Sequence, residues 1–285
     1  MKRICLSFAA LCFSLTLCRA ASERTFERTL SVSGPVSLDI NTDSGGIEVT
    51  RGAPGAVHIR GYLRSSHGWF DDGGGNVDDR MRRLADNPPI QQSGNTLRLG
   101  YVSDKWLLKG ISLRFEISAP PDTQVRARVD SGGIRVDGLK GPIDCRADSG
   151  GIDVSNVDAD VRAETDSGGI HIHDIRGPVY AKADSGGIDA LNIHGAIDVS
   201  TDSGGIHMSQ TSPAPVHARA DSGGASLRLA PGAGYDVKLH SDSGRVQVAE
   251  MTVHGTISEH RYEGTVRGGG PRVDIDVDSG NIDVE

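Results

Sequence analysis

A repeated tetrad, Asp-Ser-Gly-Gly, holds the residues of this chain that are best suited to chemistry. Each copy sets a carboxylate beside a hydroxyl and two glycines, which could serve a nucleophilic serine or an oxygen-rich cation site. Full copies begin at Asp43, Asp130, Asp148, Asp166, Asp184, Asp202 and Asp221, and variants ending in Arg and Asn begin at Asp242 and Asp278. What the copies can do depends on the elements that position them.

The number of copies argues against a protease. The tetrad resembles the Gly-Asp-Ser-Gly-Gly around the nucleophile of chymotrypsin-like proteases, where one serine works with one positioned base. Here the serine recurs in every copy, and the residue before the aspartate is Val, Ala, Thr or Ser, never Gly. We therefore predict no catalytic residues.

A structural role explains the tetrad better. An aspartate carboxylate can accept the N–H two residues on, and glycine supplies positive φ without steric cost. We predict structural turns at Asp43, Gly45, Gly46, Asp130, Gly132, Gly133, Asp148, Asp166, Asp184, Asp202, Asp221, Asp242 and Asp278.

Calcium is the alternative for these carboxylates, because repeated Asp-Gly turns bind it in other solenoids. Those solenoids use Gly-Gly-x-Gly-x-Asp with a shorter period, which this chain lacks. We predict no metal site and no cofactor. A calcium site would be the column Asp130, Asp148, Asp166, Asp184, Asp202 and Asp221, or the acidic last segment with Asp274, Asp276, Asp278, Asp283 and Glu285. The charge of that last segment would also discourage end-to-end strand pairing.

The spacing of the tetrads predicts a solenoid. From Asp130 to Asp202 the copies lie 18 residues apart, and the later intervals are 19, 21 and 36 residues, the last with a degenerate coil near Tyr262. Apolar residues alternate on both sides of each tetrad, which is strand periodicity. We predict an all-β fold, a single-stranded parallel β-helix (β-solenoid) with about 18 residues per coil and a small N-terminal capping insertion. Coils in chain order would leave Glu285 in mid-strand, with no C-terminal cap.

The outward position five residues after each aspartate reads Arg135, Asp153, His171, Asp189 and His207. Neighbouring coils would place these side chains opposite one another, so we expect a cross-strand charge ladder. A zinc ion shared by His171, Asp189 and His207 is the alternative. The two histidines would then lie ~9.6 Å apart, two strand spacings, which favours the ladder.

The N-terminus predicts export. Residues 1–20 have a basic start at Lys2 and Arg3, an apolar run, and small residues before Ala21, as in a secretory signal peptide. Lipidation of Cys18 is less favoured, because Leu17 stands where a small residue is required. We expect a periplasmic, cell-surface or secreted protein without a transmembrane segment.

The mature chain is acidic and has one cysteine. Its formal charge is −8 − 3 = −11 after loss of Lys2, Arg3 and Arg19, so nucleic acid is not an expected partner. Cys145 alone remains of the four cysteines, which excludes an intrachain disulfide. It occupies an inward column and reads as a buried small hydrophobe.

The predicted domains are the signal peptide 1–20, a first coil with a capping insertion 21–124 and the β-solenoid 125–285. Within the insertion, 51–120, residues 76–85 are expected to form a short helix with Asn76 as its cap. The insertion is best explained as a cover for the open strands of the first coil. The alternative gives Trp69 and Trp106 a role as aromatic platforms that bind a glycan or peptide.

The pattern as a whole resembles the bacterial "putative adhesin" family of unknown function, which is built of β-strand repeats. The resemblance rests on Ser33-Gly34-Pro35, a polar insertion with a helical stretch, the strand motif Gly94–Arg98, and Ser-Gly turns. It covers most of residues 30–285 and implies adhesion, without implying any catalytic residue. The regular Asp-Ser-Gly-Gly departs from the plainer Gly-Ser-Gly or Ser-Asn-Gly turns expected of that family.

We therefore expect a non-enzymatic, exported cell-envelope protein, an adhesin or a binding or scaffold module that uses a repetitive β-solenoid surface. Its expected partners are a protein or glycan of the envelope, or a second copy that associates through the solenoid ends. One alternative is a carbohydrate-active β-helix enzyme similar to polysaccharide lyases. Another is a self-assembling structural scaffold.

Overall fold

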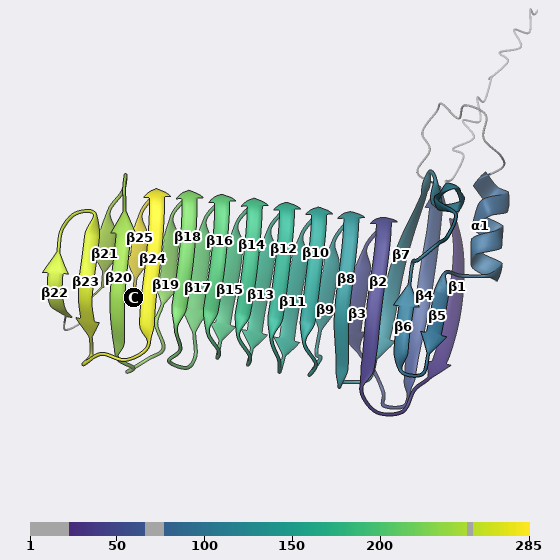
Figure 1. Cartoon of the computed structure of the whole chain (residues 1–285), viewed down its shortest axis with the longest axis horizontal. Helices are drawn as coiled ribbons and strands as arrows, with labels where there is room; N and C mark the ends of the chain where they lie inside the picture. The colour runs from purple at the N-terminus through teal and green to yellow at the C-terminus, as the bar shows by residue number, and fades with distance from the viewer. Residues whose placement is uncertain (1–22, 66–76, 250–252) are drawn as a thin grey trace, which may run out of the picture.

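The computed structural model describes residues 23–65, 77–249 and 253–285. Most of the chain forms two long sheets, A and B, in which successive strands stack side by side into a rod (Figure 1). The all-β expectation is confirmed in this form, with mostly parallel strands in sequential order. The signal peptide, Cys18, Trp69 and Asn76 lie outside the described residues.

Sheet A has 12 strands. Their order is β1 (Glu23–Ser31), β4 (Ala56–Ser65), β7 (Ile111–Ala119), β3 (Ile47–Arg51), β9 (Ile134–Asp137), β11 (Ile152–Val157), β13 (Ile170–Ile175), β15 (Ile188–Ile193), β17 (Ile206–Gln210), β19 (Ala225–Arg228), β25 (Ile282–Val284) and β21 (Val246–Val248).

Sheet B has 13 strands. Their order is β22 (Val253–Ile257), β23 (Arg261–Val266), β20 (Tyr235–Ser241), β24 (Arg272–Ser279), β18 (Val216–Ser222), β16 (Ile197–Ser203), β14 (Val179–Ser185), β12 (Val161–Ser167), β10 (Ile143–Ser149), β8 (Thr123–Ser131), β2 (Val36–Ser44), β6 (Thr96–Leu99) and β5 (Ile90–Ser93).

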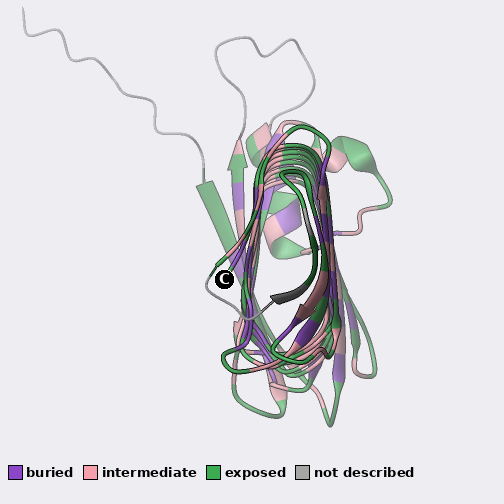
Figure 2. Ribbon diagram, turned by 90° about the vertical axis from the view of Figure 1, so that its left-hand side faces the viewer, coloured by how far each residue is buried: buried purple, intermediate pink, exposed green. Residues whose placement is uncertain are grey.

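The two sheets enclose a narrow core of small apolar side chains. Ile143 of β10 lies in register with Val125 on one side and Val161 on the other, so inward residues form columns along the rod. Seen from the end that carries β21 and β22, the sheets enclose a thin, elongated interior (Figure 2). Cys145 is fully buried in one such column, as predicted, and burial raises the pKa of its thiol. A neutral, buried thiol of this kind is unreactive.

Each tetrad forms the corner where the chain passes from sheet B to sheet A. Gly150 has φ of +147°, and a Cβ there would overlap the carbonyl oxygen of Gly132 in the preceding coil. Its N–H donates to Ser167 O in the next coil at 2.8 Å. The corners are thus joined to one another by backbone hydrogen bonds. This differs from the prediction that each aspartate accepts the N–H two residues on.

The second glycine of the tetrad is under much less constraint. A Cβ at Gly151 would lie 3.4 Å from Gly169 O, which is ordinary contact. Arg245 and Asn281 occupy this position in the two variant tetrads. The variants therefore change only the position that has room for a side chain.

The C-terminal coil is inserted between two earlier coils. Strand β24 pairs with β18 and β20, while β25 pairs with β19 and β21. Figure 1 shows β24 between β18 and β20. The prediction that coils follow chain order and end uncovered at Glu285 was wrong. Because every coil carries the same alternation and tetrad, the sequence does not reveal which copies are neighbours.

The predicted degenerate coil near Tyr262 is instead an antiparallel hairpin. Strands β22 and β23 pair with each other, and β23 pairs with β20 at the end of sheet B. The last interval of 36 residues between tetrads therefore holds this hairpin and then strand β24, which returns to a place between β18 and β20.

The insertion continues both sheets beyond the first coil. Strand β7 adds to β3 in sheet A and β6 adds to β2 in sheet B, both parallel. Strands β4, β1 and β5 follow as antiparallel neighbours. Helix α1 (Val77–Asp86), close to its predicted position, packs against β1 and β4 and buries Met81 and Leu84. In the part of the chain that the structure describes, no helix is long and apolar enough to cross a membrane.

The two glycines of a tetrad should respond differently to substitution. Gly150→Ala places a Cβ at positive φ against the Gly132 carbonyl, and we expect it to lower the free energy of unfolding by about 1–3 kcal/mol or more. Gly151→Ala is the matched control, with an expected change within about 0.5 kcal/mol. Urea unfolding measures both, and equal losses would contradict the stacking constraint.

Removal of residues 272–285 should disrupt the rod internally. It takes away β24 and β25, so β18 and β19 lose one neighbour while β20 and β21 lose their link to the rod. We expect hydrogen exchange to speed up throughout residues 216–248. Unchanged protection in β18 would show that the inserted coil is dispensable.

Candidate binding site

One exposed tryptophan is held rigidly on the N-terminal insertion. Trp106 lies in the 3₁₀ helix η1 (Lys105–Leu108), where Asp104 Oδ1 accepts its N–H at 3.0 Å. Its side chain is 44% exposed, the most of any large hydrophobic residue described. An exposed indole with a fixed backbone offers a flat apolar surface together with an N–H donor.

Arg80 of α1 contacts both the ring and the backbone of Trp106. Its guanidinium carbon lies 4.6 Å from the centroid of the Trp106 ring, within cation–π distance. Its Nη1 donates to Trp106 O at 2.8 Å and to Lys109 O at 2.7 Å. Arg80 is only 5% exposed, so a buried side chain holds η1 in place. Arg80 shares a helix face with Val77, Met81 and Leu84. That helical spacing was the sequence signal from which the burial of Arg80 could have been predicted.

The tryptophan borders a recess of about 450 Å³ at the start of the aspartate column. Its lining is Asp43, Ser44, Lys105, Trp106, Leu108, Lys109, Gly110 and Ile111. An aromatic plane beside two lysines suits a ligand that has an apolar face and anionic groups. Of the two tryptophans singled out in the sequence, the structure places only Trp106, because Trp69 lies outside the described residues.

The tetrad aspartates form one exposed row along the corners. Asp130 lies between Asp43 and Asp148 on neighbouring strands, as the paired serines beside them show. Partial burial and then the two flanking carboxylates raise the pKa of Asp130, while Lys105 opposes this shift. Within residues 23–65, 77–249 and 253–285, no three His, Cys, Asp or Glu side chains gather to hold a metal ion. The calcium alternative therefore gains no support from this row.

The predicted charge ladder on sheet A is confirmed. Asp189 accepts from His171 Nδ1 at 2.9 Å through one oxygen and from His207 Nδ1 at 3.0 Å through the other. Arg135 and Asp153 form the next pair at 3.0 Å. Both carboxylate oxygens of Asp189 are thus engaged by imidazoles directly, which leaves the zinc alternative without its bridging ligand.

Sheet B carries a second ladder that the sequence interpretation missed. Arg126 pairs with Asp144 at 3.2 Å, Arg146 pairs with Glu164 at 2.5 Å, and Arg162 also contacts Glu164. The Arg162 guanidinium lies 4.1 Å from the centroid of the Tyr180 ring. The available signal was the alternation of charge at two positions, four residues before each tetrad aspartate (Arg126, Asp144, Arg162) and two residues before it (Arg146, Glu164). These charges pair with one another between neighbouring coils.

The comparisons with known proteins fit this architecture. A family model described as "Toastrack DUF4097" matches residues 117–285, which is more than half of the chain. The chain belongs to this family. The resemblance drawn from the sequence, to a bacterial family of strand repeats, is thereby confirmed. No curated protein matches this Toastrack chain significantly.

Two solved structures are similar to this Toastrack chain. A protein from Bacteroides fragilis described as a "putative adhesin" is 16% identical, with a TM-score of 0.48 over 93% of this chain and 98% of that chain. A protein from Clostridium sporogenes described as a "putative cell adhesion protein" is 13% identical, with a TM-score of 0.30 over 92% of this chain and 99% of that chain.

The aspartate row should give the Toastrack rod a measurable dependence on pH. A raised carboxyl pKa means that the folded state takes up a proton more readily than the unfolded chain. Asp130 therefore favours folding below about pH 3.9, and this contribution is lost as the pH rises through the raised pKa. We expect Asp130→Asn to stabilise the protein at pH 7, by at most about 1 kcal/mol, and to change nothing at pH 3.

Asp144→Asn is the matched control, because Asp144 pairs with Arg126 at 3.2 Å. It should leave stability at pH 7 unchanged or slightly lower. Urea unfolding at both pH values measures the difference. A stabilising Asp144→Asn, or a destabilising Asp130→Asn at pH 7, would contradict repulsion along the row.

Proposed function

We propose that the protein is a non-enzymatic, exported binding module of the cell envelope. In this proposal the Trp106 recess binds an envelope glycan that carries anionic groups, and the rod holds the recess at a fixed distance from the opposite end. We also infer a repeat of about 18 residues per coil, supported by the register of Ile143 with Val161 and of Val161 with Val179.

The single observation that carries the proposal is the fixed, exposed ring of Trp106. A protein gains nothing in its own stability by holding a large apolar side chain 44% exposed. Here a buried arginine and two hydrogen bonds keep it in place beside Lys105 and Lys109. Rigid aromatic anchors of this kind dominate the binding energy at many interfaces.

The charge distribution supports a binding role over a lyase-like enzyme. The acids of the rod recur in each coil, and many engage a basic neighbour, as Asp189 engages His171 and His207. A polysaccharide lyase needs one off-repeat cluster of acid and base. The self-assembling scaffold was suggested by an uncovered strand at the C-terminal end of the solenoid. Strand β25 instead lies within the rod, between β19 and β21.

Substitution of Trp106 should abolish glycan binding without unfolding the protein. We expect Trp106→Ala to weaken binding to acidic envelope glycans at least tenfold, a loss of about 1.4 kcal/mol. Leu191→Ala is the matched control, because Leu191 is the other exposed large hydrophobic residue in the described part of the chain, at 39%. A glycan array with purified mature protein gives the affinities.

The same array separates the rival functions. Release of shortened, unsaturated products would indicate a lyase and overturn the non-enzymatic proposal. Equal binding by wild type and Trp106→Ala would remove the recess from the proposal. If an envelope protein binds through Trp106 and no glycan does, the partner class is protein.

A further inference from the structure

The two sheets have unequal lengths at the end that carries the C-terminal coil. In sheet B, strands β23 and β22 continue beyond β20. In sheet A, the facing strand β21 is the last one among the described residues. The inner face of β23 therefore has no strand opposite it in sheet A.

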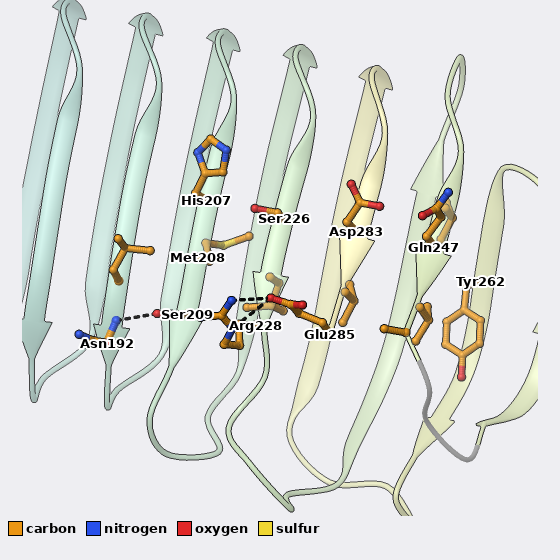
Figure 3. A pocket seen from close by; sticks show the side chains of 16 residues that line it. Asn192, His207, Met208, Ser209, Ser226, Arg228, Gln247, Tyr262, Asp283 and Glu285 are labelled. Atoms are coloured by element: carbon orange, nitrogen blue, oxygen red, sulfur yellow. Dashed lines mark hydrogen bonds and ion pairs between the residues drawn. The ribbon is translucent and has the colours of Figure 1, made fainter.

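A groove of about 1010 Å³ lies at this place. Figure 3 shows it extending over the outer face of β17, β19 and β25 to Gln247 of β21 and Tyr262 of β23. Val246 and Val248 of β21 are half-buried in its wall. The groove thus combines apolar surface with the free edge of a sheet.

The free edge of β21 offers unpaired backbone groups. Ile282 N–H donates to Arg245 O at 2.9 Å, and Ala249 N–H donates to Val284 O at 2.8 Å, so odd-numbered residues face β25. By strand alternation, Val246 and Val248 face the open side. Val246 N–H is satisfied by Glu259 O at 3.0 Å. Within the described residues, the Val246 carbonyl and both backbone groups of Val248 have no hydrogen-bond partner on the side of β21 away from β25.

Tyr262 supplies a second, independent observation. Its side chain is 1% exposed and lines the groove, and its hydroxyl has no hydrogen-bond partner within the described part of the chain. A buried hydroxyl without a partner costs about 1–3 kcal/mol. Burial raises the pKa of Tyr262, so the hydroxyl stays protonated and can donate. A ligand with a carbonyl oxygen at this point would satisfy it.

We propose that the end of this groove at β21 and Tyr262 docks an extended peptide segment of another protein, which adds to sheet A as a strand beside β21. The incoming strand pairs with the backbone of Val246 and Val248, and the Tyr262 hydroxyl donates to one of its carbonyls. Its alternate side chains are apolar toward the interior and polar or basic toward Asp283, which is exposed on β25 next to Gln247.

The two ends of the rod are not matched for end-to-end pairing, because sheet A ends in β21 at this end and in β1 at the other. The opposite end also differs, because edge strand β1 presents Glu23, Arg24, Glu27 and Arg28, charges that discourage strand addition. Strand β21 carries no charged residue. We therefore take a strand from a different protein, and not the opposite end of a second copy, as the occupant.

This docking site is separate from the Trp106 recess. Helix η1, which carries Trp106, contacts α1 and β7 at one end of the rod, whereas β21 and β23 lie at the other end (Figure 1). The inference therefore goes beyond the proposed glycan binding, and either can fail without the other.

A synthetic seven-residue peptide of alternating valine and lysine or threonine, labelled with fluorescein, tests the proposal by fluorescence polarisation. We expect saturable binding to the full mature protein. The same peptide with N-methylated backbone amides should bind at least tenfold more weakly, because its side chains are unchanged while its edge cannot pair. Equal binding of both peptides would overturn strand addition.

Two variants locate the site. Val248→Pro removes the N–H that faces the groove, at an edge position where proline is tolerated, and should weaken peptide binding at least tenfold. Tyr262→Phe should weaken it as well, yet raise the melting temperature of the free protein, because it deletes an unsatisfied hydroxyl. Trp106→Ala should leave peptide binding unchanged.

The remaining outcomes are decisive. If Val248→Pro unfolds the protein, as judged by circular dichroism, Tyr262→Phe alone carries the test. Peptide binding unaffected by Tyr262→Phe and by Val248→Pro would overturn the site. A concentration-dependent dimer in light scattering that Val248→Pro abolishes would make a second copy the occupant and overturn the peptide.

Discussion

Backbone hydrogen bonds between stacked corners hold this rod in register. Gly150 N–H reaches Ser167 O at 2.8 Å and Ile152 N–H reaches Gly169 O at 3.0 Å, and the same pair of bonds recurs from coil to coil. The corners can approach this closely only if the first glycine has no Cβ, because its φ is positive and a neighbouring carbonyl fills the space. Where this contact is made, the strands on both sides are brought into register, and Ser149 stands beside Ser131 and Ser167.

Strict register has an electrostatic consequence. Residues at equivalent positions become neighbours ~4.8 Å apart, so a repeated acid repels its copies while alternating signs attract. The chain shows both cases. Partial burial, and then the neighbouring tetrad aspartates, raise the pKa of Asp130, whereas Arg126 and Asp144 pair at 3.2 Å and Asp189 engages two histidines. The ladders pair much of the rod's outward charge between coils, and both candidate sites lie at its ends.

The ends are not equivalent, and this asymmetry gives the molecule its two candidate sites. At one end the insertion lengthens both sheets, and Arg80 fixes Trp106 beside the first tetrad. At the other, a hairpin lengthens sheet B alone, so β21 keeps a free edge beside the Tyr262 hydroxyl. A regular repeat cannot supply such features, because each coil is satisfied by its neighbours.

The repeat itself was readable from the sequence, because tetrad spacing and strand alternation are local properties of the chain. They determined the β-class, the corners, the inward column of Cys145 and the ladder through Asp189. Local patterns do not reveal which coils are neighbours. The coil around Asp278 has the same alternation as every other coil, so its strands could pair with the coil around Asp221 or with any other coil. Tertiary structure decided that β24 and β25 enter the rod between earlier coils, that Tyr262 lies in a hairpin, and that Arg80 supports Trp106. Each of these depends on contacts between residues far apart in the chain, where the free energy of packing, and not the local pattern, selects the partner.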